Sequence, residues 1–119
     1  MGQVGQRRIA ERYRVVTTPV RWKVARRRRN PTRAKFSVVD AAVVEVSVLG
    51  AAIVCPAKWE AFVGTRVEVY WQGLTGTAFI HRAAPYPGSK DLVLYGIEWV
   101  DNPAVMGQAL LDTFVPVTK

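Results

Sequence analysis

Hydrophobic and polar residues alternate along much of this chain, which is the pattern of β-strands with one buried face. The clearest alternation covers residues 66–71, where Val67, Val69 and Trp71 fall on one face and charged or polar residues on the other. β-Branched and aromatic residues dominate five further segments, which also predict strands. These segments are residues 12–24, 34–46, 50–54, 74–82 and 92–100, and residues 56–65 form a predicted connection with room for a helical turn at 59–62. Pro19 predicts an edge or bulged position in the first strand.

The last segment follows a different pattern. Asn102 is a suitable N-cap, and Met106, Leu110 and Phe114 recur at a spacing of four on one helical face. This predicts one short helix at about residues 102–115. Short strands separated by turns, with a single helix, favour an all-β fold that closes into an antiparallel barrel, because closure removes exposed sheet edges. The four Trp and four Phe side chains are expected in the core or at its rim.

Composition is typical of a single globular domain. The chain has 119 residues, of which 50% are hydrophobic, which is enough for one core and too few for two full domains. We therefore expect a flexible N-terminal segment at residues 1–12 and one folded domain at residues 13–119. The richest apolar stretch, residues 41–56, contains Glu45 and is too short to span a membrane. No apolar segment follows the N-terminal arginines as a secretory signal requires, so the expected compartment is the cytoplasm.

Basic residues are concentrated at one end of the chain. Residues 1–35 hold twelve Lys and Arg side chains and a single acid, Glu11, whereas residues 36–119 hold five basic and eight acidic side chains. A positive field of this kind attracts phosphate-bearing partners such as nucleotides, nucleic acid or an anionic membrane surface. Four of the arginines are consecutive in a predicted loop at residues 26–33. A solvated basic segment without a ligand is the simplest alternative.

Two short segments carry binding chemistry. Arg8 and Arg12 precede the first predicted strand, and guanidinium groups can form two parallel hydrogen bonds with phosphate oxygens or with the O6/N7 edge of guanine. Glu45 and Ser47 lie two residues apart at the end of a strand, so their side chains are expected on the same face. Gly50 follows them and permits a sharp turn or the close approach of a ligand.

Together these segments resemble the signature of the PilZ domain, the bacterial receptor module for cyclic di-GMP. Arg8-Ile9-Ala10-Glu11-Arg12 matches the R-x-x-x-R motif of that family. Residues 45–50, Glu-Val-Ser-Val-Leu-Gly, match its [D/N]-x-S-x-x-G motif except that glutamate stands at the first position. Residues 51–53, 63–69 and 95–99 also look like the family pattern, as does the closing helix. The resemblance therefore covers most of the chain.

The resemblance implies a six-stranded antiparallel barrel of the PilZ type with a short C-terminal helix, and cyclic di-GMP bound on its outer surface. It implies that the two motif arginines contact the phosphates and guanine edges, that the motif serine hydrogen-bonds guanine or a phosphate, and that the motif glycine permits the turn. From side-chain chemistry, Glu45 is expected to accept from guanine N1–H and N2–H, and Arg7 adds another guanidinium. The expected binding residues are Arg7, Arg8, Arg12, Glu45, Ser47 and Gly50.

No catalytic or metal-binding motif accompanies these residues. His81 has no second histidine to complete a metal site, Cys55 is expected to be a small buried hydrophobe that forms no internal disulfide, and we find no nucleophile motif or phosphate-cradling glycine loop. We expect a receptor that is not an enzyme and uses no cofactor, whose partners are cyclic di-GMP and an unidentified downstream protein. Two alternatives stay open. One is a PilZ-like adaptor that does not bind the nucleotide, and the other, ranked lower, is a basic barrel that binds nucleic acid.

Overall fold

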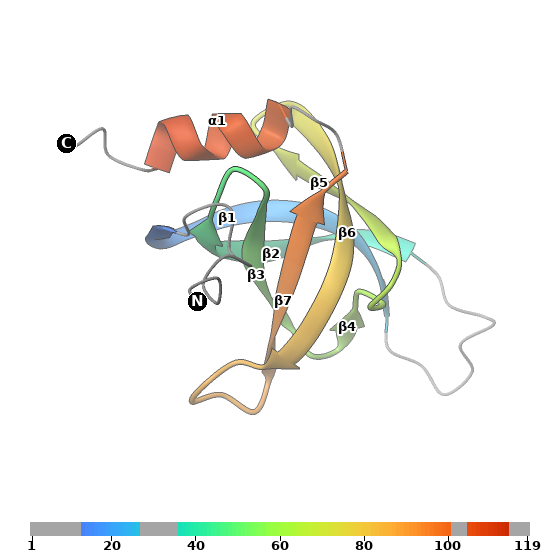
Figure 1. The fold of residues 1–119 in the computed structure, drawn as a ribbon. Coiled ribbons are helices and arrows are strands. Elements are labelled where there is room, and N and C mark those ends of the chain that lie inside the picture. The colour runs from blue at the N-terminus through green and yellow to red at the C-terminus, as the bar shows by residue number, and fades with distance from the viewer. Residues whose placement is uncertain (1–12, 27–35, 101–104, 115–119) are drawn as a thin grey trace, which may run out of the picture.

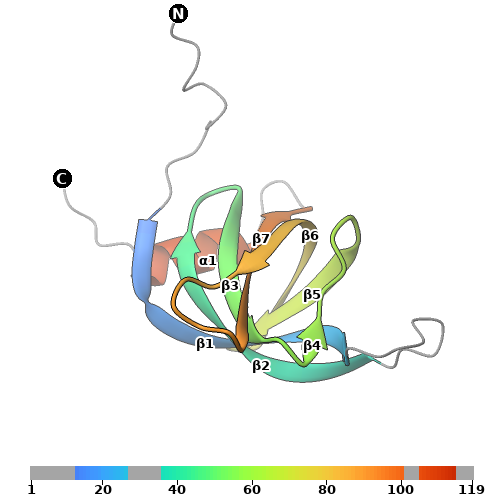
Figure 2. The same ribbon diagram turned by 90° about the horizontal axis from the view of Figure 1, so that it is seen from below.

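The computed structural model describes residues 13–26, 36–100 and 105–114. Its strands form one antiparallel sheet that curves around a common axis, as Figures 1 and 2 show. The elements are β1 Tyr13–Arg26, β2 Phe36–Val46, β3 Gly50–Pro56, β4 Trp59–Glu60, β5 Arg66–Trp71, β6 Leu74–Pro85, β7 Leu92–Trp99 and α1 Val105–Phe114. Neighbouring strands follow the order β2-β3-β7-β6-β5-β1, and β1 also pairs with β2. The sheet is therefore a closed six-stranded barrel with one short C-terminal helix, which confirms the predicted fold.

The barrel interior is filled by the inward-facing side chains of each strand. Trp22 of β1 is fully buried, and its ring meets the edge of Tyr95 with centroids 5.2 Å apart. The Trp22 indole N–H donates to the Sγ atom of Cys55 over 3.4 Å, and the backbone N–H of Ala61 donates to the Tyr95 hydroxyl at the same distance. The polar ends of these two aromatic side chains are thus hydrogen-bonded, which offsets the cost of burying them in the core.

Helix α1 lies across one end of the barrel (Figure 1). Met106 and Leu110 are each only 1% exposed and join the barrel core. The helix approaches β6 at a glycine, because a Cβ on Gly76 would lie 2.7 Å from the Cβ of Met106. On the helix itself, a Cβ on Gly107 would lie 2.6 Å from Nε1 of Trp99. Glycines on both elements therefore permit the close packing of α1. Among the residues that the structure describes, no helix is long and apolar enough to cross a membrane.

The backbone angles at the tip of the β5–β6 hairpin suit a tight turn. Gln72 and Gly73 form the tip of the β5–β6 hairpin with φ angles of 49° and 80°, and positive φ at both central positions is the geometry that matches the twist of a two-residue hairpin. The β1–β2 register shifts between Arg14 and Thr18, just before Pro19. Pro19 itself lies in regular register opposite Ala42, so the irregularity falls before the proline and not at it.

Three expectations about local structure are wrong. Residues 59–60 form strand β4 and not a helical turn, and Glu60 lies opposite Ala25 of β1. Pairing with the end of β1 outweighs the local preference of these residues for a helical turn. Two phenylalanines expected in the core or at its rim are surface residues, since Phe36 is 59% and Phe79 is 39% exposed. Both belong to strands whose opposite face is the core, so their positions follow from strand register and not from hydrophobicity.

Candidate functional site

The structure describes one of the two predicted motifs. Arg7, Arg8 and Arg12 lie outside the described residues. Glu45 lies near the end of β2 and is half-buried, while Ser47 and Gly50 are both buried at the two ends of the turn that joins β2 to β3. The three residues of the second motif are therefore brought together by one hairpin.

Ser47 closes this hairpin through its hydroxyl group. The backbone N–H of Gly50 donates to Ser47 Oγ over 3.1 Å, and the Ser47 hydroxyl lies 3.4 Å from the carbonyl oxygen of Gly50, to which it donates. The backbone N–H of Ser47 also donates to that carbonyl over 2.9 Å. Serine favours such turns because its short side chain hydrogen-bonds to nearby backbone groups. The serine of the motif therefore has a structural role in the hairpin.

Gly50 is required by the neighbouring strand. A Cβ at this position would overlap the carbonyl oxygen of Ile97 and would lie 3.0 Å from the Ile97 carbonyl carbon and 3.1 Å from Cα of Glu98. These are backbone atoms of β7, which cannot move without breaking the β3–β7 ladder. The glycine of the motif thus allows β3 and β7 to meet closely at this end of the barrel.

The register of β1 brings the start of the strand to the same hairpin. Tyr13 lies opposite Val46, and Arg14 lies opposite Glu45. Directly opposed residues of an antiparallel pair are about 5 Å apart, so Tyr13, the first residue after the first motif in the sequence, lies beside the second motif.

Small residues form a shallow floor on the outer face beside the hairpin. Ala52 of β3 lies opposite Glu45 on one side and opposite Gly96 of β7 on the other. Gly96 in turn lies opposite Arg82 of β6. Directly opposed residues project to the same face of a sheet, so these four positions form one lateral row on the outside of the barrel. No side chain larger than a methyl group stands between the glutamate and the arginine in this row.

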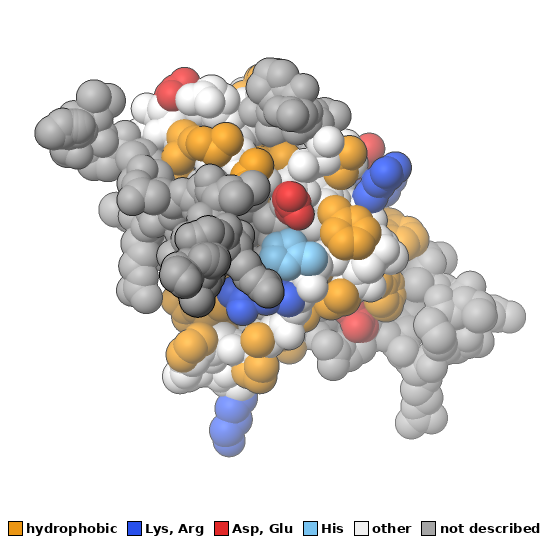
Figure 3. Space-filling view, in the orientation of Figure 1, with side chains coloured by type: hydrophobic (Ala, Val, Ile, Leu, Met, Phe, Trp, Pro, Cys, Tyr) orange, Lys and Arg blue, Asp and Glu red, His pale blue; other side chains and the backbone are white. Residues whose placement is uncertain are grey.

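Polar and aromatic side chains surround this floor. Phe79, His81, Arg82 and Glu98 are exposed on β6 and β7. In Figure 3 the only histidine of the chain, drawn pale blue, lies among hydrophobic, acidic and basic side chains on this face. His81 is therefore an exposed residue of this face.

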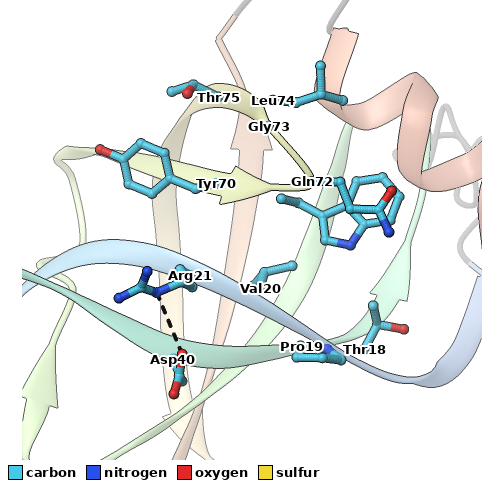
Figure 4. A pocket seen from close by; sticks show the side chains of 11 residues that line it. Thr18, Pro19, Val20, Arg21, Asp40, Tyr70, Gln72, Gly73, Leu74 and Thr75 are labelled. Carbon is cyan, nitrogen blue, oxygen red and sulfur yellow. Dashed lines mark ion pairs between the residues drawn. The ribbon is translucent and has the colours of Figure 1, made fainter.

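A separate recess lies between β1 and the β5–β6 hairpin (Figure 4). Its volume is about 670 Å³, and β1 and β5 pair beside it at Arg21–Tyr70 and Trp22–Val69. At its rim the Nε atom of Arg21 lies 3.7 Å from Oδ1 of Asp40, with both side chains largely exposed; such a pair contributes little stability. The recess is lined by Thr18, Pro19, Val20, Arg21, Asp40, Tyr70, Trp71, Gln72, Gly73, Leu74 and Thr75. None of the sequence-predicted binding residues is among them.

Two groups outside the motif have perturbed ionisation. Burial raises the pKa of the Cys55 thiol above its ordinary value, and the hydrogen bond from Trp22 opposes part of this shift. The Tyr70 hydroxyl donates to Oε1 of Glu68 over 2.5 Å, and this hydrogen bond raises the pKa of Tyr70. No group of three His, Cys, Asp or Glu side chains gathers to hold a metal within the described ranges. The chemistry available at the hairpin and floor is therefore hydrogen bonding and charge pairing.

Sequence reasoning did not select Arg82 or Gly96. The available signals were a glycine inside a strongly apolar strand segment, which often marks a close backbone approach, and the His81–Arg82 pair at the end of a predicted strand. Comparison with family models, with curated proteins and with solved structures gives no significant match for this chain. Its function is therefore inferred from the residues and their geometry.

Proposed function

We propose that this protein is a receptor of the PilZ type that binds cyclic di-GMP on the outer face of its barrel. The arginines of the first motif contact the phosphates and guanine edges. The hairpin at Glu45, Ser47 and Gly50 provides the opposing surface. The downstream partner is a second protein that recognises the ligand-bound surface.

The observation that carries this proposal is the position of Tyr13, the residue that follows the first motif in the sequence, beside the second motif on a closed six-stranded barrel. The two motifs are separated by 32 residues of sequence, from Arg12 to Glu45. The β1–β2 register nevertheless places Tyr13, which follows the first motif, opposite Val46 in the second. In the proposed site, the guanidinium groups of the first motif donate to the phosphates, and the Glu45 carboxylate accepts from N1–H and N2–H of guanine.

The proposed mechanism is a change in surface on binding. The ligand contacts both the segment before β1 and the β2–β3 hairpin, so its binding energy depends on bringing the two together. A ligand shifts a protein between states only by contacts that differ between them, and the phosphate–guanidinium pairs are such contacts. The surface formed by the ligand, the arginine segment and the hairpin is what the partner protein distinguishes from the free receptor.

The test is isothermal titration of cyclic di-GMP into the wild type, Arg8→Ala, Arg12→Ala and Arg66→Ala. Arg66 is an exposed arginine on β5, so its variant controls for the loss of one positive charge. Hydrogen bonds to charged groups contribute about 1.5–3 kcal/mol, so each motif variant should bind at least about tenfold more weakly, whereas Arg66→Ala should bind like the wild type. Wild-type affinity in both motif variants would contradict the proposal.

One observation favours the second candidate, an adaptor that does not bind the nucleotide. Ser47 Oγ and Gly50 both have structural roles in the hairpin, so the motif pattern can persist without a ligand, and Glu45 stands where the family has Asp or Asn. The adaptor predicts no heat of binding at micromolar cyclic di-GMP. Saturable binding in the same titration would exclude it.

A further inference from the structure

The outer face of β6 contains a bulge that directs two side chains over β7. Ile80 lies opposite Ile97 and Arg82 lies opposite Gly96, so His81 is an extra residue between these pairs. A Cβ on Gly96 would lie 3.0 Å from both Cγ and Nε of Arg82 and 3.3 Å from Cε1 of His81. The arginine side chain therefore crosses the glycine and reaches from β6 towards β3. Bulges often redirect side chains in this way.

The position of this guanidinium is restricted although the residue is exposed. Its stem rests on the backbone of Gly96, which a larger residue would prevent. No hydrogen bond or ion pair joins the Arg82 side chain to any residue in the parts of the chain that the structure describes. An exposed arginine whose stem is held in place by a neighbouring strand is suited to bind a planar acceptor pair, because less rotamer freedom is lost on binding.

Arg82 and Glu45 lie at opposite sides of the small-residue floor. They are the β6 and β2 members of the row that runs through Gly96 and Ala52. Adjacent strands are about 4.8 Å apart. Because the arginine already reaches over β7, about two strand spacings, roughly 10 Å, separate its guanidinium from the β2 backbone. A flat base placed over this row therefore has a donor group on one side and a carboxylate on the other.

We propose that Arg82 reads the O6/N7 edge of a guanine that lies on the floor, while Glu45 accepts from the N1–H and N2–H groups of the same base. This inference rests on the proposed binding of cyclic di-GMP and adds a residue that determines base specificity. Guanine presents two acceptors at O6 and N7, which match the arginine fork, whereas adenine presents a donor at N6. The arrangement of charges thus selects guanine over adenine.

The test compares cyclic di-GMP with cyclic di-AMP, which has the same phosphates and a different base edge. Both are titrated into the wild type, Arg82→Ala, Arg82→Lys and the control Arg66→Ala. A good bidentate contact contributes about 1–3 kcal/mol of discrimination, so Arg82→Ala should lose about tenfold to a hundredfold of its affinity for cyclic di-GMP. Its weaker affinity for cyclic di-AMP should stay unchanged. Arg82→Lys should not restore discrimination, because lysine keeps the charge and lacks the fork.

The outcomes separate this inference from the proposed function. Equal losses for both nucleotides would show a phosphate contact and overturn the base-reading role. Unchanged binding of cyclic di-GMP in Arg82→Ala would overturn any role of Arg82, while the receptor function would still be supported by the wild-type titration. Absence of binding in the wild type would overturn both.

Gly96→Ala provides a second test that leaves the arginine in the chain. The three atoms nearest to the added methyl group belong to the side chains of Arg82 and His81, which can move by a few tenths of an ångström, so the fold should be retained. The displaced guanidinium and raised floor should weaken binding of cyclic di-GMP by at least about tenfold. Wild-type affinity together with wild-type thermal stability in Gly96→Ala would contradict a role of the floor in binding cyclic di-GMP.

Discussion

Replacing Gly50 by alanine tests whether the glycine of the second motif is needed for β3 and β7 to pair at this end of the barrel. The new Cβ would overlap the Ile97 carbonyl oxygen, so β3 must move away from β7 at this end. Three hydrogen bonds depend on the present position of this end of β3. They are Ser47 N–H to the Gly50 carbonyl, Gly50 N–H to Ser47 Oγ, and Trp99 N–H to the Leu49 carbonyl. At about 1 kcal/mol each, losing two or three of them costs about 2–3 kcal/mol, in the range of other overpacked sites.

The assay is urea or thermal unfolding followed by tryptophan fluorescence, since Trp22, Trp71 and Trp99 are buried. The expected loss corresponds to a fall in Tm of about 8–15 °C for a domain of this size. Gly88→Ala is the matched control, because Gly88 has φ +82° and a Cβ added there would have no neighbouring atom within 4 Å; it should lose about 1–2 kcal/mol from backbone strain alone. Stability of Gly50→Ala within about 0.5 kcal/mol of the wild type would refute the close approach of the two strands.

Two further predictions concern the helix and the thiol. Gly76→Ala should cost about 1–3 kcal/mol, because the methyl group would lie 2.7 Å from the Cβ of Met106; faster amide exchange confined to α1 should accompany the loss, and unchanged unfolding would contradict the packing. Cys55 should react with iodoacetamide far more slowly in the folded protein than in guanidinium chloride, because burial raises its pKa and shields it. Because the folded-state pKa is the higher one, the thiol also makes stability fall as pH rises above its ordinary value of 9.0. Equal alkylation rates in the two states would show that the thiol is not buried.

The fold was predictable because its signals are local and repeated. Alternation at Val67, Val69 and Trp71 indicates one buried face, and the Gln72-Gly73 pair is typical of a hairpin such as the one between β5 and β6. Strand pairing across the barrel is not local, so the C-terminal end of β6, predicted at residue 82 and observed at Pro85, and the short strand β4 were not predicted correctly. The exposure of Phe79 has the same origin, since which face of a strand points outward depends on its partners.

The candidate site was predictable only in part. Ser47 and Gly50 were found because they form a motif in consecutive sequence. The role of Gly50 against β7 was not predicted, because it depends on the Ile97 carbonyl, which is distant in sequence. The hydrogen bonds of Ser47 in the turn are made within the motif itself. Arg82 was missed because its importance comes from a bulge and from Gly96 across the sheet, and neither relation is visible in a linear pattern.

The most direct test of the receptor function is isothermal titration of the full chain with cyclic di-GMP, with GTP at the same concentration as the control for simple attraction of anions. We predict saturable binding of cyclic di-GMP with a defined stoichiometry, and weak, unsaturated heats with GTP that vanish as salt is raised. No binding, or equal weak binding of the two nucleotides, would contradict the receptor function.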